Sequence, residues 1–237
     1  MENNFKNIAI LIDAENVQAR WFKEILEKVG LYGRVTVKRV YADWSSDDSR
    51  YPLIKEWKRA VRDEGLMAIQ QFRYKGDKNI SDFALVIDAM DLLFKERVDC
   101  FCLVSGDSDF GRLIQYIKEQ GPYCIGFSEK GKAKANFMNT FDEFTELDTE
   151  HNQQDSNFKL TEFIERAIDR LAEKSGDEWV YFSNLGIYLK NIKADFHISQ
   201  YGFKNLYDYL SQGENKNKYE LKIEEDRTTK LVRKKVG

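Results

Sequence analysis

The sequence predicts an α/β fold in residues 1–148, a parallel β-sheet with helices on both faces, followed by a small winged helix-turn-helix domain in residues 158–237. Three observations support this division. Short apolar runs alternate with helix-like segments through the first 148 residues, which is typical of a parallel sheet with crossover helices. Residues 149–157 contain no apolar side chain, which is typical of a linker. Amphipathic segments and a pair of alternating runs follow this linker.

Apolar runs bounded by polar or turn residues predict the strands of the first domain. The run IAILID is short and apolar enough for a strand that is buried on both faces. The predicted strands are 8–13, 35–42, 67–72, 100–105 and 123–127, with a short edge strand at 143–147. Apolar residues at helical spacing predict helices at 17–29, 52–61, 81–93, 109–119 and 132–140. Because helices occupy the connections, consecutive strands should run parallel.

The residues after the linker change to a different pattern. Amphipathic spacing predicts helices at 160–173, 182–192 and 201–210. Alternating residues at 218–236 predict a hairpin. Three short helices followed by a hairpin form the outline of a winged helix-turn-helix domain.

The composition excludes several functional classes. Hydrophobic residues make up 42% of the chain, enough for packed cores, and no apolar run approaches the roughly 20 residues that span a bilayer. The first residues lack the basic stretch and cleavage site of a signal peptide. Three cysteines cannot form a fully paired disulfide framework, so we expect a reduced, cytoplasmic setting. Two histidines do not favour a Ser-His-Asp hydrolase, so hydrolytic chemistry would depend on carboxylates.

Acidic residues follow two of the predicted strands directly. Asp13 comes after the first strand, and Asp107 and Asp109 come after the strand 100–105. Asp82 lies in the first turn of the helix that begins near residue 81. Because the carboxyl ends of parallel strands and the starts of the following helices share one edge of a sheet, these four acids are expected to converge there. Asp43 ends another strand and is a weaker fifth candidate.

Convergence of carboxylates implies a compensating charge. Two carboxylates ~4 Å apart repel by roughly 4 kcal/mol at an effective dielectric constant near 20. Oxygen ligands favour Mg²⁺ or Mn²⁺ over zinc, and such an ion activates water and stabilises charge on a phosphate. The alternative for each acid alone is a local role: Asp109 as a helix cap, or Asp82 as a partner of a helix dipole. Asn16 would either hold a water or phosphate oxygen, or stabilise a turn.

Three sequence blocks carry a resemblance to a known family. The segments ILIDAENV, KNISDFALVIDAMDLL and LVSGDSDF, in this order and spacing, resemble the NYN domain, a branch of the PIN-like nucleases, over about residues 7–147. The resemblance implies a PIN-like α/β/α fold and metal-dependent ribonuclease activity. The matching acids, implied to be catalytic and metal-binding, are Asp13, Asp82, Asp107 and Asp109, and Asn16 is the matching polar residue of the first block.

The C-terminal part resembles a second family. The segments WVYFSNLGIYLKN and DFHISQYGFKNLYDYL, with a winged hairpin after them, resemble an OST-HTH or LOTUS domain. This resemblance implies an RNA-binding module or, in some relatives, a protein-docking module.

Basic and aromatic residues near the predicted acidic edge are candidates for RNA contacts. The net charge of −3 does not favour a uniformly basic nucleic-acid binder but leaves local patches open. The candidate phosphate contacts are Lys75, Lys78, Lys130, Lys132 and Lys134, and the alternative for each is an ordinary solvated surface position. Trp44 is the best candidate to stack on an unpaired base, which favours single-stranded RNA over duplex.

Taken together, the residues and the resemblance predict a metal-dependent endoribonuclease that acts on single-stranded RNA and carries an RNA-binding or docking module. The alternative is a regulatory adaptor that binds RNA or protein and whose acidic pocket is vestigial. A phosphatase with an aspartate nucleophile is disfavoured, since Asp13-Ala14-Glu15 does not supply the Asp-x-Asp that it needs. No membrane partner is expected.

Overall fold

The computed structural model describes residues 5–45, 52–72, 80–95, 97–148, 160–193, 196–226 and 228–235. The chain divides into two compact units. The first contains residues 1–29 and 33–153, and the second contains residues 30–32 and 154–237. None of the helices in the described ranges is long and apolar enough to cross a membrane.

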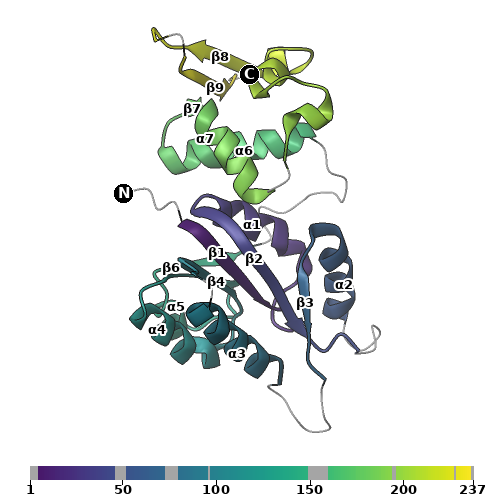
Figure 1. The fold of residues 1–237 in the computed structure, drawn as a ribbon, viewed down its shortest axis with the longest axis vertical. Helices are drawn as coiled ribbons and strands as arrows, with labels where there is room; N and C mark the ends of the chain where they lie inside the picture. The colour runs from purple at the N-terminus through teal and green to yellow at the C-terminus, as the bar shows by residue number, and fades with distance from the viewer. Residues whose placement is uncertain are drawn as a thin grey trace. The chain divides into compact units, whose positions relative to one another are not determined.

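A six-stranded parallel sheet forms the centre of the first unit, as predicted (Figure 1). Its strand order is β3-β2-β1-β4-β5-β6, and every neighbouring pair is parallel. The strands are β1 (Phe5–Asp13), β2 (Gly33–Ala42), β3 (Met67–Gln70), β4 (Cys100–Val104), β5 (Tyr123–Glu129) and β6 (Glu143–Leu147). The chain turns back to the middle of the sheet between β3 and β4, which places β4 beside β1 rather than beside its predecessor.

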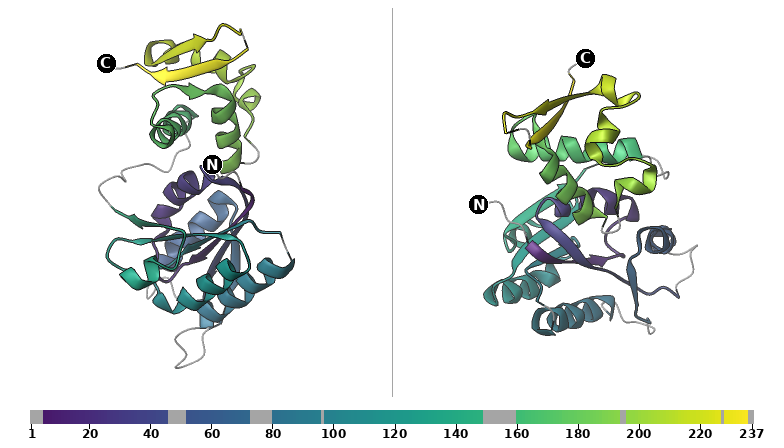
Figure 2. Two further views of the ribbon diagram at one scale, coloured as in Figure 1. Left: turned by 90° about the vertical axis from the view of Figure 1, so that its left-hand side faces the viewer. Right: turned by 45° about the horizontal axis from the view of Figure 1, so that its top comes forward.

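Helices cover both faces of this sheet (Figure 2). They are α1 (Phe22–Gly30), α2 (Pro52–Glu64), α3 (Ile80–Lys95), α4 (Gly111–Glu119) and α5 (Ala135–Met138). Short 3₁₀-helices precede α1 and α4, at Ala19–Trp21 and Ser108–Phe110. The predicted helix over 132–140 is shorter than expected, because Gly131 turns the chain with a φ of 76° and α5 begins only after Lys134.

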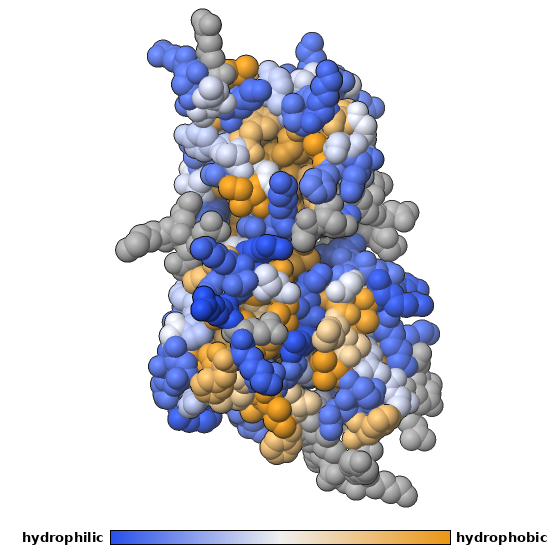
Figure 3. Space-filling model, in the orientation of Figure 1, coloured by the Kyte–Doolittle hydropathy of each residue, from blue (hydrophilic) through white to orange (hydrophobic). Residues whose placement is uncertain are grey.

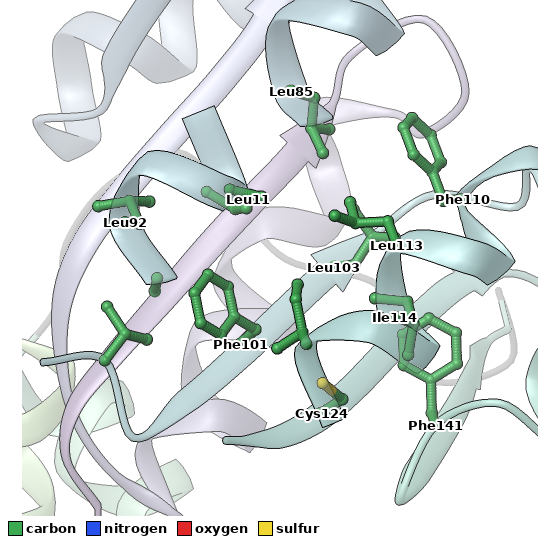
Figure 4. Packing of buried hydrophobic residues seen from close by; sticks show 14 of the residues in the cluster. Leu11, Leu85, Leu92, Phe101, Leu103, Phe110, Leu113, Ile114, Cys124 and Phe141 are labelled. Atoms are coloured by element: carbon green, nitrogen blue, oxygen red, sulfur yellow. The ribbon is translucent and has the colours of Figure 1, made fainter. Parts of the chain in front are cut away.

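Buried side chains fix α3 and α4 on one face of the sheet (Figure 4). Leu11 of β1 and Phe101 of β4 pack with Leu85 and Leu92 of α3 and with Ile114 of α4. Successive strand residues point to opposite faces. The buried alternate residues of β1, which include Ile10, therefore face the side covered by α1 and α2. This two-sided burial explains the continuously apolar sequence of the central strands.

The second unit contains helices and a three-stranded antiparallel sheet of order β7-β9-β8. Its elements are α6 (Leu160–Ser175), β7 (Val180–Tyr181), α7 (Phe182–Ile192), α8 (Leu206–Leu210), α9 (Asn215–Lys218), β8 (Tyr219–Ile223) and β9 (Lys230–Lys234). The predicted hairpin corresponds to β8 and β9. The predicted helix over 201–210 is interrupted, because Gly202 adopts a left-handed conformation and Asn205 caps a new helix by accepting the Asp208 N–H.

Candidate active site

The two central strands of the first unit end side by side. β1 and β4 pair in parallel, and Ile12 lies opposite Val104 in the last pair of the register. Asp13 and the residues after Val104 therefore leave the sheet at neighbouring points. Helix α3, which carries Asp82 in its first turn, packs on the same two strands. This is the sheet edge at which open α/β proteins bind ligands.

Asp13 is buried and held in a fixed orientation. Its side chain is 1% exposed. One carboxylate oxygen accepts the Glu15 N–H at 3.1 Å, and the other accepts the Ser105 hydroxyl at 3.0 Å and the Asn16 side-chain amide. Burial raises the pKa of Asp13 above its usual value, while these hydrogen bonds act in the opposite direction.

Ser105 connects the ends of β1 and β4. Its hydroxyl is fully buried, donates to Asp13 and accepts the Asp107 N–H at 3.1 Å. Asp107 in turn caps the 3₁₀-helix Ser108–Phe110 by accepting the Asp109 N–H at 2.9 Å. The capping role that the sequence suggested for Asp109 therefore belongs to Asp107. The sequence-based prediction missed Ser105, although a hydroxyl at the end of a wholly apolar strand was a usable signal.

The acids that follow β1 and β4 and the acid at the start of α3 interact electrostatically. Burial, followed by the negative charges of four other carboxylates, raises the pKa of Asp82 from 3.8 to about 6. Those carboxylates are Asp13, Asp107, Glu15 and Asp109. The edge of the sheet therefore concentrates five acids within electrostatic reach of one another.

Glu15 is the acid that the sequence-based prediction left out. It lies two residues after Asp13, and its carboxylate accepts the Ser81 hydroxyl at 3.4 Å, which connects the loop after β1 with the start of α3. The segment ILIDAENV contains both acids, so their spacing was visible in the sequence. The convergence of these two acids with Asp82 was not visible, because it depends on where the packing of α3 places the start of that helix.

The donor chemistry of this cluster fits a hard divalent cation. Every acidic side chain in it offers carboxylate oxygens, the ligands that Mg²⁺ and Mn²⁺ prefer. Over the described ranges, no three acidic, histidine or cysteine side chains are arranged as a complete metal cage. Mg²⁺ is usually held by only one or two carboxylates and keeps several of its waters, so an incomplete cage is compatible with it.

Asn16 and Lys132 pack around the first loop. The Asn16 side-chain amide donates to Asp13, which supports the turn role for this residue. The Lys132 ammonium donates to the Asn16 carbonyl at 2.9 Å and forms an ion pair with Glu129 at 2.9 Å. A Cβ at Gly106 would lie 2.9 Å from the Cβ of Lys132, so glycine is needed for this close approach. The structure thus places one predicted lysine next to the acidic loop.

The remaining predicted contacts are distributed differently. Lys130 follows β5 and pairs with Asp148, which follows the edge strand β6. Lys134 is exposed at the start of α5. Lys75 and Lys78 lie outside the described residues. Trp44 is half-buried and donates its indole N–H to the Ile69 carbonyl at 2.9 Å.

Asp43 and Asp88 have their own structural partners. The buried Asp43 carboxylate accepts the Ser45 hydroxyl at 2.6 Å and the Gln70 amide at 2.9 Å, so it organises the ends of β2 and β3. Asp88, one turn and a half further along α3 than Asp82, pairs with Arg39 of β2. These contacts assign both acids to the stability of the fold.

Comparisons with known proteins agree with this geometry. The NYN domain model matches residues 7–148, and the OST-HTH/LOTUS domain model matches residues 159–212. The chain belongs to the NYN domain family and carries an OST-HTH/LOTUS domain after it. Both resemblances seen in the sequence are therefore confirmed, in the predicted order. The NYN domain indicates a nuclease, and the LOTUS domain indicates RNA binding.

Two similar proteins have no described function. An uncharacterised protein of Methanocaldococcus jannaschii is 26% identical over 181 residues, which cover 72% of this chain and 70% of that protein. A crystal structure of a protein of unknown function from Vibrio parahaemolyticus matches with a TM-score of 0.51 and 20% identity, over 63% of this chain and 97% of that one. This structural match supports the fold alone.

Proposed function

We propose that this protein is an endoribonuclease that cleaves single-stranded RNA with the help of Mg²⁺ or Mn²⁺, and that its C-terminal domain binds RNA or docks a protein partner. The observation that carries the proposal is the convergence of acids from β1, β4 and α3 on one edge of the sheet, with Ser105 hydrogen-bonded to both strand ends. A cluster of this kind is typical of metal-assisted phosphodiester hydrolysis.

The proposed metal ligands and catalytic residues are Asp13, Asp82, Asp107 and Asp109. A divalent ion bound by them would activate a water molecule and stabilise the negative charge that develops on the phosphate. Asp13 suits this role because its hydrogen bonds leave it little freedom to rotate. Asp82 approaches from a different element, so the position of α3 determines how closely the acids meet.

The chain offers positive charge and an aromatic surface for the substrate. We propose that Lys132 and Lys134, which lie in the segment after β5, contact RNA phosphates together with Asn16 and Trp44. Lys130, Lys75 and Lys78 remain candidates for the same backbone track. The described cysteines are buried and have free thiols, which suits a reducing compartment, and we therefore place the activity in the cytoplasm.

Cleavage of a labelled single-stranded RNA tests the proposal. The full chain should cut this RNA with Mg²⁺ or Mn²⁺ present, lose activity with EDTA, and leave the matching duplex intact. Asp82→Asn and Asp107→Asn should each reduce the rate by about 100-fold or more. Asp91→Asn is the matched control, because Asp91 is exposed on the same helix and pairs with Lys95. Wild-type rates in Asp82→Asn and Asp107→Asn, with circular dichroism unchanged, would exclude the assigned site.

A second candidate function is a non-catalytic adaptor that binds RNA or protein. The match of residues 159–212 to the OST-HTH/LOTUS domain, which indicates RNA binding, supports this alternative. It predicts RNA binding without cleavage and no heat of binding when Mn²⁺ is titrated into the protein. Calorimetric titration of the wild type and of Asp82→Asn therefore separates the two functions, since the nuclease requires a Mn²⁺ site that the variant weakens.

A further inference from the structure

Large apolar side chains are exposed along the outer face of α3. Phe83, Ile87 and Phe94 are 67%, 68% and 63% exposed. Met90 is partly buried and packs against the core. Residues three and four positions apart lie on one face of a helix, so these four side chains form a continuous stripe, here called the α3 stripe. Single exposed apolar side chains are ordinary on a protein surface, but a contiguous group of them is typical of an interaction surface.

The edge strand β3 extends this apolar surface. β3 lies at one end of the sheet, and its Met67 is 56% exposed. A shallow hollow lies between β3 and α3 and is lined by Ile69 of β3 and by Ile87 and Phe94 of the α3 stripe. Figure 3 shows apolar surface gathered over this part of the first unit. The surface therefore includes a helix ridge and an adjacent depression.

The charges beside the stripe already have partners. Asp88 pairs with Arg39 and accepts the Tyr41 hydroxyl. Asp91 pairs with Lys95 one turn further along α3, at 2.5 Å. An apolar partner that covered the stripe would therefore not bury an unpaired charge. The two acids do not suit an RNA backbone, which needs unpaired cations. These features favour a protein surface as the occupant.

The exposed area is sufficient for self-association. A fully exposed side chain of this size presents about 200 Å². The stripe and Met67 together therefore present about 500 Å². Two such surfaces would bury about 1,000 Å², the lower bound for a weak specific interface. A contact of this size should form at micromolar rather than nanomolar concentrations.

The spacing of the stripe identifies the partner. Its residues are separated by four, three and four positions, a pattern that is unchanged when the helix is reversed. Two antiparallel copies of α3 would therefore place Phe83 against the partner's Phe94 and Ile87 against the partner's Met90. This self-complementarity is the requirement for a two-fold symmetric interface. We infer that two copies of this chain associate through an antiparallel pair of α3 helices.

Sedimentation equilibrium of the full chain tests the association. The wild type should change from monomer to dimer between about 1 and 100 µM. The double variant Ile87→Glu/Phe94→Glu places four carboxylates in the dimer interface and should raise the dissociation constant by at least about 100-fold. Ile223→Glu is the matched control, because Ile223 is an exposed isoleucine on β8 and its substitution should leave the equilibrium unchanged.

Disulfide cross-linking tests the geometry independently of affinity. In the antiparallel pair, residue 83 lies about 16 Å along the helix axis from the same residue of its partner, beyond disulfide reach. Phe83→Cys and Phe94→Cys should therefore cross-link poorly when each is oxidised alone. A mixture of the two should give the heterodimeric disulfide.

Three results would overturn the inference. These are a wild type that stays monomeric at 100 µM, a double variant that dimerises as well as the wild type, and a mixture that cross-links no better than the separate variants. An Ile87→Glu variant that weakens RNA binding without changing the oligomeric state would assign the stripe to RNA instead. Circular dichroism of each variant verifies that the helices remain folded.

Discussion

Replacing Asp82 by asparagine should stabilise the metal-free protein at neutral pH. The pKa of Asp82 is raised from 3.8 to about 6 in the folded state, because burial and four neighbouring carboxylates disfavour its charged form. Below pH 3.8 the group is protonated in both states and has no effect on stability. As the pH rises from 3.8 to about 6, the carboxyl group ionises in the unfolded state while the folded state still holds its proton. The wild type therefore loses stability relative to Asp82→Asn over this range, and the loss is complete above it.

The size of this effect follows from the same values. A rise in pKa from 3.8 to about 6 corresponds to about 3 kcal/mol. The carboxyl group is only half-buried, so solvent screening reduces the expected gain in Asp82→Asn to about 1–2 kcal/mol at pH 7.5. At pH 4.5 about a third of this gain should remain.

Urea unfolding followed by tryptophan fluorescence measures the difference. Three of the four tryptophans belong to the first unit: Trp21, Trp44 and Trp57. The measurements are made in EDTA at pH 7.5 and 4.5, with Asp91→Asn as the control that should change stability by less than about 0.5 kcal/mol. Added Mn²⁺ should then stabilise the wild type more than Asp82→Asn. Two results would refute the clustering of charges: an Asp82→Asn variant that is less stable than the wild type at pH 7.5, or a gain in stability that is the same at pH 7.5 and 4.5.

Two further substitutions test how the site is built. Ser105→Ala removes the fully buried hydroxyl that donates to Asp13. This variant should be less stable than the wild type by about 1–3 kcal/mol and should cleave RNA more slowly. Wild-type stability in this variant would contradict the role of Ser105 in connecting the two strand ends. Arg39→Met removes the cation that pairs with Asp88 of α3 and leaves this acid with the Tyr41 hydroxyl of β2, so it should destabilise the first unit by about 1–3 kcal/mol in urea unfolding. Arg112→Ala, at an exposed ion pair, should change stability by less than about 1 kcal/mol and is the control for Arg39→Met.

The elements of the first unit could be predicted because their signals are local. A strand buried on both faces must be apolar throughout, and a helix on a sheet must repeat its apolar residues every three or four positions. The runs that became β1 and β4 show the first pattern, and the segment that became α4 shows the second. Acids placed directly after strands could be predicted to share an edge for the same reason, since parallel strands all end at the same side of a sheet.

The tertiary structure decided which of these groups meet. The Ser105–Asp13 hydrogen bond joins residues 92 positions apart, and it exists because the strand order places β4 beside β1. Lys130 pairs with Asp148 and Lys132 donates to the Asn16 carbonyl, although both lysines lie in one short polar segment. The sequence by itself thus determined the helices and strands, their buried faces and the sheet edge where the acids gather. Each of these depends on patterns among residues that are close together along the chain. Pairings across the sheet depend on strand order and on the packing of α3, which no local pattern encodes.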